Sequence, residues 1–106
     1  MKIRNKIINS KFKKNMLNKD GKIVLEAGTV FNVDKEAKFD IEGELLLGKN
    51  NFKKGKDTLL MMKKDSTFKA KNSKFFHGCD IMIFENAKFD IGKSFINSDA
   101  KIRCYK

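Results

Sequence analysis

One five-residue phrase recurs along this chain and limits its possible folds more than any other feature. The sequence AKFDI at residues 37–41 returns at residues 87–91, and looser copies lie at residues 66–70 (STFKA) and 100–104 (AKIRC). Each copy starts with a small residue and then has apolar residues at alternate positions, so a strand would send those residues inward. A small residue suits a coil corner, because successive coils can then stack about 4.8 Å apart. The phrase therefore predicts one face of a parallel β-helix, with one copy of the phrase in each coil.

The rest of the chain after residue 22 also has a period of two rather than 3.6. Its apolar runs are short, and the pieces KNNFKKGKD, KKDS and KNSK between them have the composition of turns. So many short strands in so few residues predict an all-β protein, a single-stranded solenoid of short strands. The predicted strands contain residues 23–25, 30–33, 39–41, 45–47, 59–62, 68–70, 81–84, 89–91 and 102–104.

A chain of 106 residues fits a single domain with one core. We assign residues 23–106 to the β-helix domain and residues 1–22 to a short basic cap or arm, irregular or helical, because Ile3, Ile7 and Ile8 have helical spacing. No apolar run approaches the roughly 20 residues that a membrane helix needs. The first ten residues lack the apolar segment of a secretion signal, so the sequence predicts a cytoplasmic protein without a membrane segment.

The net charge of +11 comes almost entirely from lysine, since Arg4 and Arg103 are the two arginines among 24 basic residues. Residues 1–22 carry eight basic residues and one acidic residue, and residues 49–71 carry eight and two. These lysines serve either solubility or the binding of an anionic partner. Phenylalanines among them, such as Phe52, could stack on single-stranded nucleic acid. Arginine is the usual residue for recognising bases, and these segments are rich in lysine instead. Nucleic acid is therefore the less favoured partner.

The C-terminal third, residues 75–106, resembles the stretch that leads into the active site of hexapeptide-repeat sugar O-acetyltransferases. Residues 91–95 (IGKSF) and 96–101 (INSDAK) are similar to the hexads of that family, in which a branched aliphatic residue begins each six-residue step. The resemblance implies a left-handed parallel β-helix, a homotrimer, and acetyl-coenzyme A held between neighbouring subunits. It also implies transfer of an acetyl group to a sugar hydroxyl with a neutral histidine as general base.

The same resemblance gives three candidates for a sugar-acceptor pocket. Asn97 matches the first asparagine of the family's acceptor-pocket run, Asp99 stands where the second would be, and Arg103 follows them. The alternative for Asn97 is an inward asparagine that hydrogen-bonds its neighbours in the coil ladder.

The catalytic histidine of the family and its coenzyme-binding coils belong downstream of the position of Lys106. His77 precedes the matched hexads and cannot take that role. We therefore assign no catalytic, cofactor-binding or metal-binding residue in this chain and leave open whether it is an enzyme. A truncated, split or degenerate acetyltransferase is expected, and acetyl-coenzyme A is implied only for a complete family member.

Two further residue groups have both a chemical and a structural interpretation. His77 and Cys79, with Asp80 beside them, could form a Cys-His nucleophile, but an edge histidine beside a buried free thiol explains the same residues, and Cys104 is then a second free thiol. Asp40 and Asp90 occupy equivalent places in the repeated phrase. Paired carboxylates can do acid-base work, whereas residues between two inward side chains usually form a solvated face.

Two functions remain open at this level. The first is an acetyltransferase-like β-helix that is catalytically incomplete by itself, and the second is a non-enzymatic module that binds an anionic glycan or nucleic acid or assembles with other chains. A solenoid without a polar cap leaves its last coil open. Self-association, or pairing with a complementary chain, is therefore expected through residues 95–106.

Overall fold

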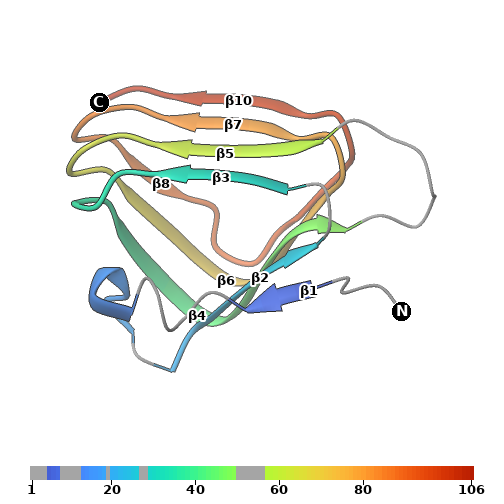
Figure 1. Cartoon of the computed structure of the whole chain (residues 1–106), viewed down its shortest axis with the longest axis horizontal. Helices are drawn as coiled ribbons and strands as arrows, with labels where there is room; N and C mark the ends of the chain where they lie inside the picture. Colours follow the sequence, from blue (N-terminus) through green and yellow to red (C-terminus); the bar gives the residue numbers. More distant parts are fainter. Residues whose placement is uncertain (1–4, 8–12, 19, 27–28, 50–56) are drawn as a thin grey trace.

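The computed structural model describes residues 5–7, 13–18, 20–26, 29–49 and 57–106 (Figure 1). Among these residues the one helical element is the short 3-10 turn η1 (Lys13–Asn15), so the protein is all-β, as the sequence predicts. In the same residues, no helix is long and apolar enough to cross a membrane. The strands are β1 (Asn5–Ile7), β2 (Lys22–Glu26), β3 (Thr29–Val33), β4 (Lys38–Lys49), β5 (Thr58–Met62), β6 (Thr67–Phe76), β7 (Asp80–Ile83), β8 (Lys88–Asp90), β9 (Phe95–Ile96) and β10 (Lys101–Cys104).

From β2 onward the chain passes back and forth between two sheets whose strands all run parallel, and β8 and β9 follow one another in the same sheet. One sheet has the order β1-β2-β4-β6-β8, with β9 also paired to β6, and the other has the order β3-β5-β7-β10. The exception to parallel pairing is β1, which lies antiparallel to β2. In Figure 1 the four strands of the second sheet lie together at the top, facing β4, β6 and β8 across the interior.

The strand register gives the number of residues in each circuit, meaning one passage of the chain through both sheets. Ile81 pairs with Leu60, 21 residues before it, and with Ile102, 21 residues after it. Phe89 likewise pairs with Phe68, 21 residues before it. The offset is 29 between Phe39 and Phe68, because β4 and β5 are separated by a longer connection. Insertions in a turn leave the ladder intact, since turn residues lie outside it.

Residues with left-handed backbone conformation mark three bends in each of the two circuits nearest the C-terminus. One circuit has them at Asp65, Asn72 and Gly78, with φ of 59°, 45° and 79°. The next has them at residues 86, 92 and 99, with φ of 61°, 58° and 62°. Asparagine, aspartate and glycine are the residues that adopt this conformation most readily. The bend at Asn72 falls within β6, so these two circuits have three sides each.

Small residues line one of these corners, as the repeated phrase predicts. Ala37, Ser66 and Ala87 are all buried and follow one another in successive circuits. The amide of Lys38 donates to the carbonyl of Ser66 at 2.8 Å, and the amide of Thr67 donates to that of Ala87 at 2.9 Å. The corner therefore continues the parallel ladder, with small buried side chains along it.

Aromatic side chains fill the interior beside this corner. Phe39, Phe68 and Phe89 pair in register on three neighbouring strands, and Phe39 and Phe68 are completely buried. Ring centroids are 6.3 Å apart for the first pair and 5.1 Å for the second. Each buried phenylalanine contributes about 1.5–3 kcal/mol from removal of its apolar surface from water.

The two ends of the core are covered differently. At the N-terminal end, Met16 is buried and bridges Phe39, while Asn15 donates from Nδ2 to the carbonyls of Lys35 and Ala37, both at 2.7 Å. This is part of the predicted cap; Ile3 and Ile8 lie outside the described residues. At the other end, the inward side chains of the last circuit pack against the core but remain only half-buried: Phe89, Ile91, Ile96, Ile102 and Cys104.

Two predictions about the strands are wrong. Residues 100–104 do not lie on the same face as the other copies of the phrase, because β10 pairs with β7 in the second sheet. The KNSK piece is not a loop: it lies within β6 and only bends there, at Asn72. The KKDS piece is a turn, as predicted, and most of KNNFKKGKD lies outside the described residues.

Candidate interaction surface

The outer face of the β3-β5-β7-β10 sheet carries apolar side chains at positions that alternate with core residues. In β5, Leu60 and Met62 point into the core and are buried, whereas Leu59 and Met61 point outward and are half-buried. Met82 takes the same position in β7. We call this surface the methionine face; it consists of Val30, Asn32, Leu59, Met61, Lys63, Asp80, Met82, Phe84, Lys101, Arg103 and Tyr105.

The register sets these side chains in rows across the strands. Met61 pairs with Met82, and Asn32 and Arg103 flank them on the two outer strands. At the edges of the face, Val30 is 48% exposed and Tyr105 is 68% exposed. An exposed apolar patch usually marks an interaction site.

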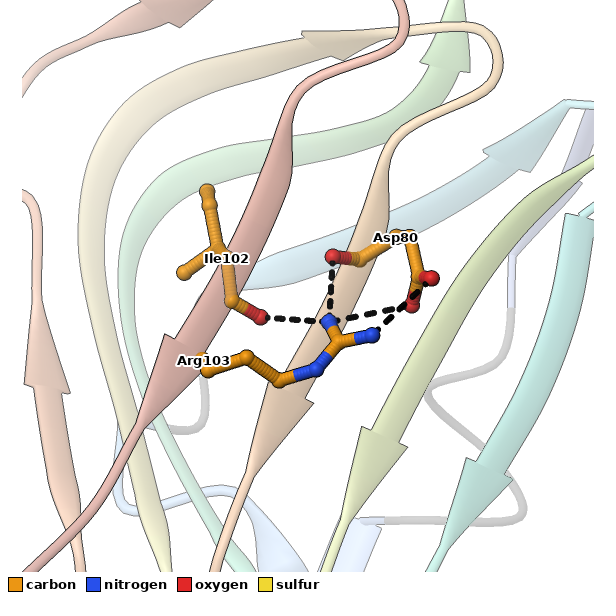
Figure 2. Close-up of polar contacts among 3 residues, drawn as sticks. All are labelled: Asp80, Ile102 and Arg103. Atoms are coloured by element: carbon orange, nitrogen blue, oxygen red, sulfur yellow. Dashed lines mark hydrogen bonds and ion pairs between the residues drawn. The ribbon is translucent and has the colours of Figure 1, made fainter.

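Arg103 and Asp80 form an ion pair in the same face (Figure 2). Arg103 donates from Nη1 to Oδ1 of Asp80 at 3.2 Å and from Nη2 to Oδ2 at 3.1 Å. Nη1 also donates to the carbonyls of Asp80, at 3.1 Å, and Ile102, at 3.0 Å. This fork geometry orients the guanidinium toward Asp80.

Next to this ion pair, Phe84 and Tyr105 stack with ring centroids 4.6 Å apart and planes only 4° from parallel. Phe84 directly follows the last residue of β7, and Tyr105 directly follows the last residue of β10. The stacked pair therefore extends the methionine face beyond the ends of these two strands. Aromatic residues, methionine and arginine are the types enriched in protein interfaces, and lysine is depleted there. The methionine face combines all three in a chain whose basic residues are mostly lysine.

The outer side of the other sheet, along the strand segments that hold the repeated phrase, is charged instead. Lys69 pairs in register with Asp40 on one side and Asp90 on the other. Nearby, Lys71 lies 3.8 Å from Glu42. Asp40 and Asp90 are thus two strand spacings apart, about 10 Å, with a lysine between them. They belong to a solvated ladder of alternating charge, and the geometry does not make them a carboxylate pair.

Along β2 and the second half of β4, outward residues are apolar too, but they are covered. Val24 and Leu46 pair with each other in register; they are 6% and 7% exposed and lie outside the core cluster. Residues 23–25 (IVL) of β2 and 45–47 (LLL) of β4 are apolar at inward and outward positions alike. This is typical of strands that are buried on both faces. The strands of the methionine face read LLMM and IMIF, yet their outward side chains are not covered by described residues.

The three candidates for an acceptor pocket each have their own contacts in the structure. Asn97 and Asp99 are exposed and lie in the turn before β10, where the amide of Asp99 donates to the carbonyl of His77 at 3.1 Å. Arg103 lies further along, on the methionine face, and its hydrogen bonds go to Asp80 and Ile102. Asn97 contributes its main-chain carbonyl, which accepts from Sγ of Cys79 at 3.2 Å.

His77 and Cys79 are not on one strand. His77 lies in a turn, and its buried Nδ1 has no hydrogen-bond partner among the described residues, whereas Cys79 is fully buried. Burial raises the pKa of the Cys79 thiol, which favours the unreactive neutral form. Both cysteines are free, and Cys104 is half-buried. In the described ranges, no group of three or more His, Cys, Asp or Glu side chains is arranged to hold a metal ion.

The sequence analysis missed the methionine face, although the sequence contains its signal. Leu59–Met62 and Ile81–Phe84 are apolar at every position, unlike the alternating AKFDI phrase. A continuous apolar run indicates a strand with apolar residues on both faces. A comparison with protein-family models gave no match, and searches of curated proteins and of solved structures gave none either.

Proposed function

We propose that this chain is a parallel β-helix that works as a protein-binding module, with the methionine face as its binding surface. The alternation of the strands between two parallel sheets and the 21-residue register support the β-helix. The single observation that carries the function is the composition of the face. It has two methionines, an arginine held by an ion pair and a stacked aromatic pair. Its central strands have apolar residues on both sides.

This proposal takes precedence over the acetyltransferase hypothesis on geometric grounds. Three six-residue steps would give about 18 residues per circuit, whereas the circuits at the C-terminal end take 21. Membership of the acetyltransferase family remains a prediction from residues 75–106. Acetyl transfer from acetyl-coenzyme A to a sugar by the purified chain would establish it.

Binding of an anionic polymer has less support from the described lysines. Lys69 alternates with acidic residues across the strands, and Lys64 lies 3.5 Å from Glu36. Much of the lysine-rich sequence lies outside the described residues. That alternative remains a prediction, with a steep loss of affinity at rising salt as its signature.

Site-specific photo-crosslinking tests the binding function. A photoreactive amino acid replaces Met82 in one variant and Lys69, on the charged face, in the matched control, and both proteins are irradiated in the producing cells. We expect protein adducts from position 82 and few from position 69. Equal yields from the two positions, or none from position 82, would contradict the proposed function.

A further inference from the structure

We propose that Met61 and Met82 form a reversible oxidation site, at which hydrogen peroxide converts both thioethers to sulfoxides and so switches off binding through the methionine face. The loss of binding rests on the proposed function, whereas the site itself rests on the burial, register and neighbours of the two methionines. Dedicated reductases return methionine sulfoxide to methionine, so the change is reversible.

Burial divides the described methionines into two pairs. Met16 and Met62 lie in the core and are 4% and 1% exposed. Met61 and Met82 point outward from β5 and β7 and are half-buried, within reach of solvent. An oxidant has to reach the sulfur atom before it can react there. Hydrogen peroxide should therefore oxidise the outward pair first and spare the core pair.

The neighbours of the outward pair favour the oxidised form. Met61 and Met82 pair in register, with Asn32 beside Met61 on β3 and Arg103 beside Met82 on β10. A sulfoxide oxygen is a good hydrogen-bond acceptor, whereas a thioether sulfur is a weak one. The side-chain amide of Asn32 is a donor, and the five N–H groups of Arg103 allow a further bond besides those to Asp80. Each methionine thus has a donor next to it in the row.

The reaction is a two-electron oxidation of sulfur. The sulfur lone pair attacks one oxygen of the peroxide, so that an S–O bond forms as the O–O bond breaks. The departing hydroxide takes the proton of the transferred oxygen and leaves as water. The sulfur loses two electrons and the peroxide gains them. Two polar, chiral groups then replace the apolar centre of the methionine face, a change that disrupts methionine-rich interfaces.

Peptide mapping of the full chain by tandem mass spectrometry tests the site. The purified protein is treated with about 10 mM hydrogen peroxide, and sulfoxide formation is followed at each described methionine. We expect the rates at Met61 and Met82 to exceed those at Met16 and Met62 by about tenfold or more. In urea, where the chain is unfolded, these rates should converge. Equal rates in the folded chain would overturn the inference.

Photo-crosslinking tests the switch. A photoreactive amino acid replaces Leu59, which points outward on the same strand as Met61. The purified chain, untreated or oxidised, is irradiated in an extract of the producing cells. We expect oxidation to lower the yield of protein adducts by about fivefold or more, and methionine sulfoxide reductases to restore it. The circular dichroism spectrum should not change on oxidation, because the sulfoxides lie outside the core.

The outcomes separate this inference from the proposed function. If adducts form equally before and after oxidation of Met61 and Met82, or if the reductases do not reverse the loss, the inference fails and the proposed function stands. If the untreated chain gives no adducts from position 59, the proposed function fails and the switch fails with it. The peptide map then still decides whether the two methionines are the oxidation site.

Discussion

Phe68 packs on Phe39 across one strand spacing, with ring centroids 6.3 Å apart and both side chains completely buried. The two residues are partners in the parallel pairing of β4 with β6. Phe68 also makes edge contacts with Phe75 and Phe89, at 6.0 and 5.1 Å. One side chain thus joins three circuits of the chain.

Phe68→Ala should lower the free energy of unfolding by about 3–5 kcal/mol, because the change leaves a large cavity in a region with little freedom to collapse. Urea denaturation followed by circular dichroism measures the loss. Phe95→Ala is the matched control, since Phe95 is 68% exposed and its ring contact is with Lys74 Nζ, 5.5 Å from the ring centroid. We expect the control to cost less than about 1 kcal/mol. Equal losses would contradict the described core.

Asn86 offers a test of the corners, because its φ of 61° lies in the left-handed region. Asn86→Ala should destabilise the fold by about 1 kcal/mol, whereas Asn86→Gly should be neutral or slightly stabilising. The same pair of changes at the neighbouring exposed Glu85 should show no preference for glycine over alanine. Thermal and urea denaturation report both comparisons.

Asp80 and Arg103 should couple only weakly in the folded monomer. Their side chains are 36% and 26% exposed, and solvent screens ion pairs of this kind. A double-mutant cycle with Asp80→Asn and Arg103→Gln should give a coupling energy of about 0.5–1 kcal/mol. A coupling energy above about 3 kcal/mol would show a fully buried pair and contradict the exposed face.

Cys79 gives the stability a pH dependence. Burial raises the pKa of its thiol in the folded state, so its contribution to stability is fully present below the thiol's unfolded pKa of about 8.5. That contribution is lost as the pH rises toward the folded pKa. Relative to Cys79→Ala, the wild type should lose up to about 1.4 kcal/mol per pH unit in this range. Cys104→Ala keeps Cys79 and is the control; a parallel pH dependence of wild type and Cys79→Ala would refute the assignment.

Much of the fold could be predicted from the sequence, because strand pairing and core packing leave a local pattern. The alternation in AKFDI places Phe39 and Ile41 inward, and Ala37 identifies a buried corner. The phrase at 100–104 has the same alternation but belongs to the second sheet. Local alternation tells which residues point inward, but it does not tell to which side of the circuit a strand belongs.

The circuit length and the interaction surface were harder to predict, for physical reasons. The longer connection between β4 and β5 changes the spacing of the phrase from 21 to 29 without disturbing the ladder, so the repeat is hidden. Bends at Asn86 and Asp99 depend on residues that are also common in ordinary turns. The pairing of Met61 with Met82 depends on long-range register, which no single run of sequence contains.

The parallel register with its 21-residue offset places Met61, Met82 and Arg103 on one face, and the whole account depends on it. Nuclear Overhauser spectra of the isotope-labelled chain measure that register directly. We predict cross-strand contacts of Ile81 with both Leu60 and Ile102 in the pattern of parallel strands. Antiparallel contacts among β5, β7 and β10, or pairing of Ile81 with other residues, would contradict the account.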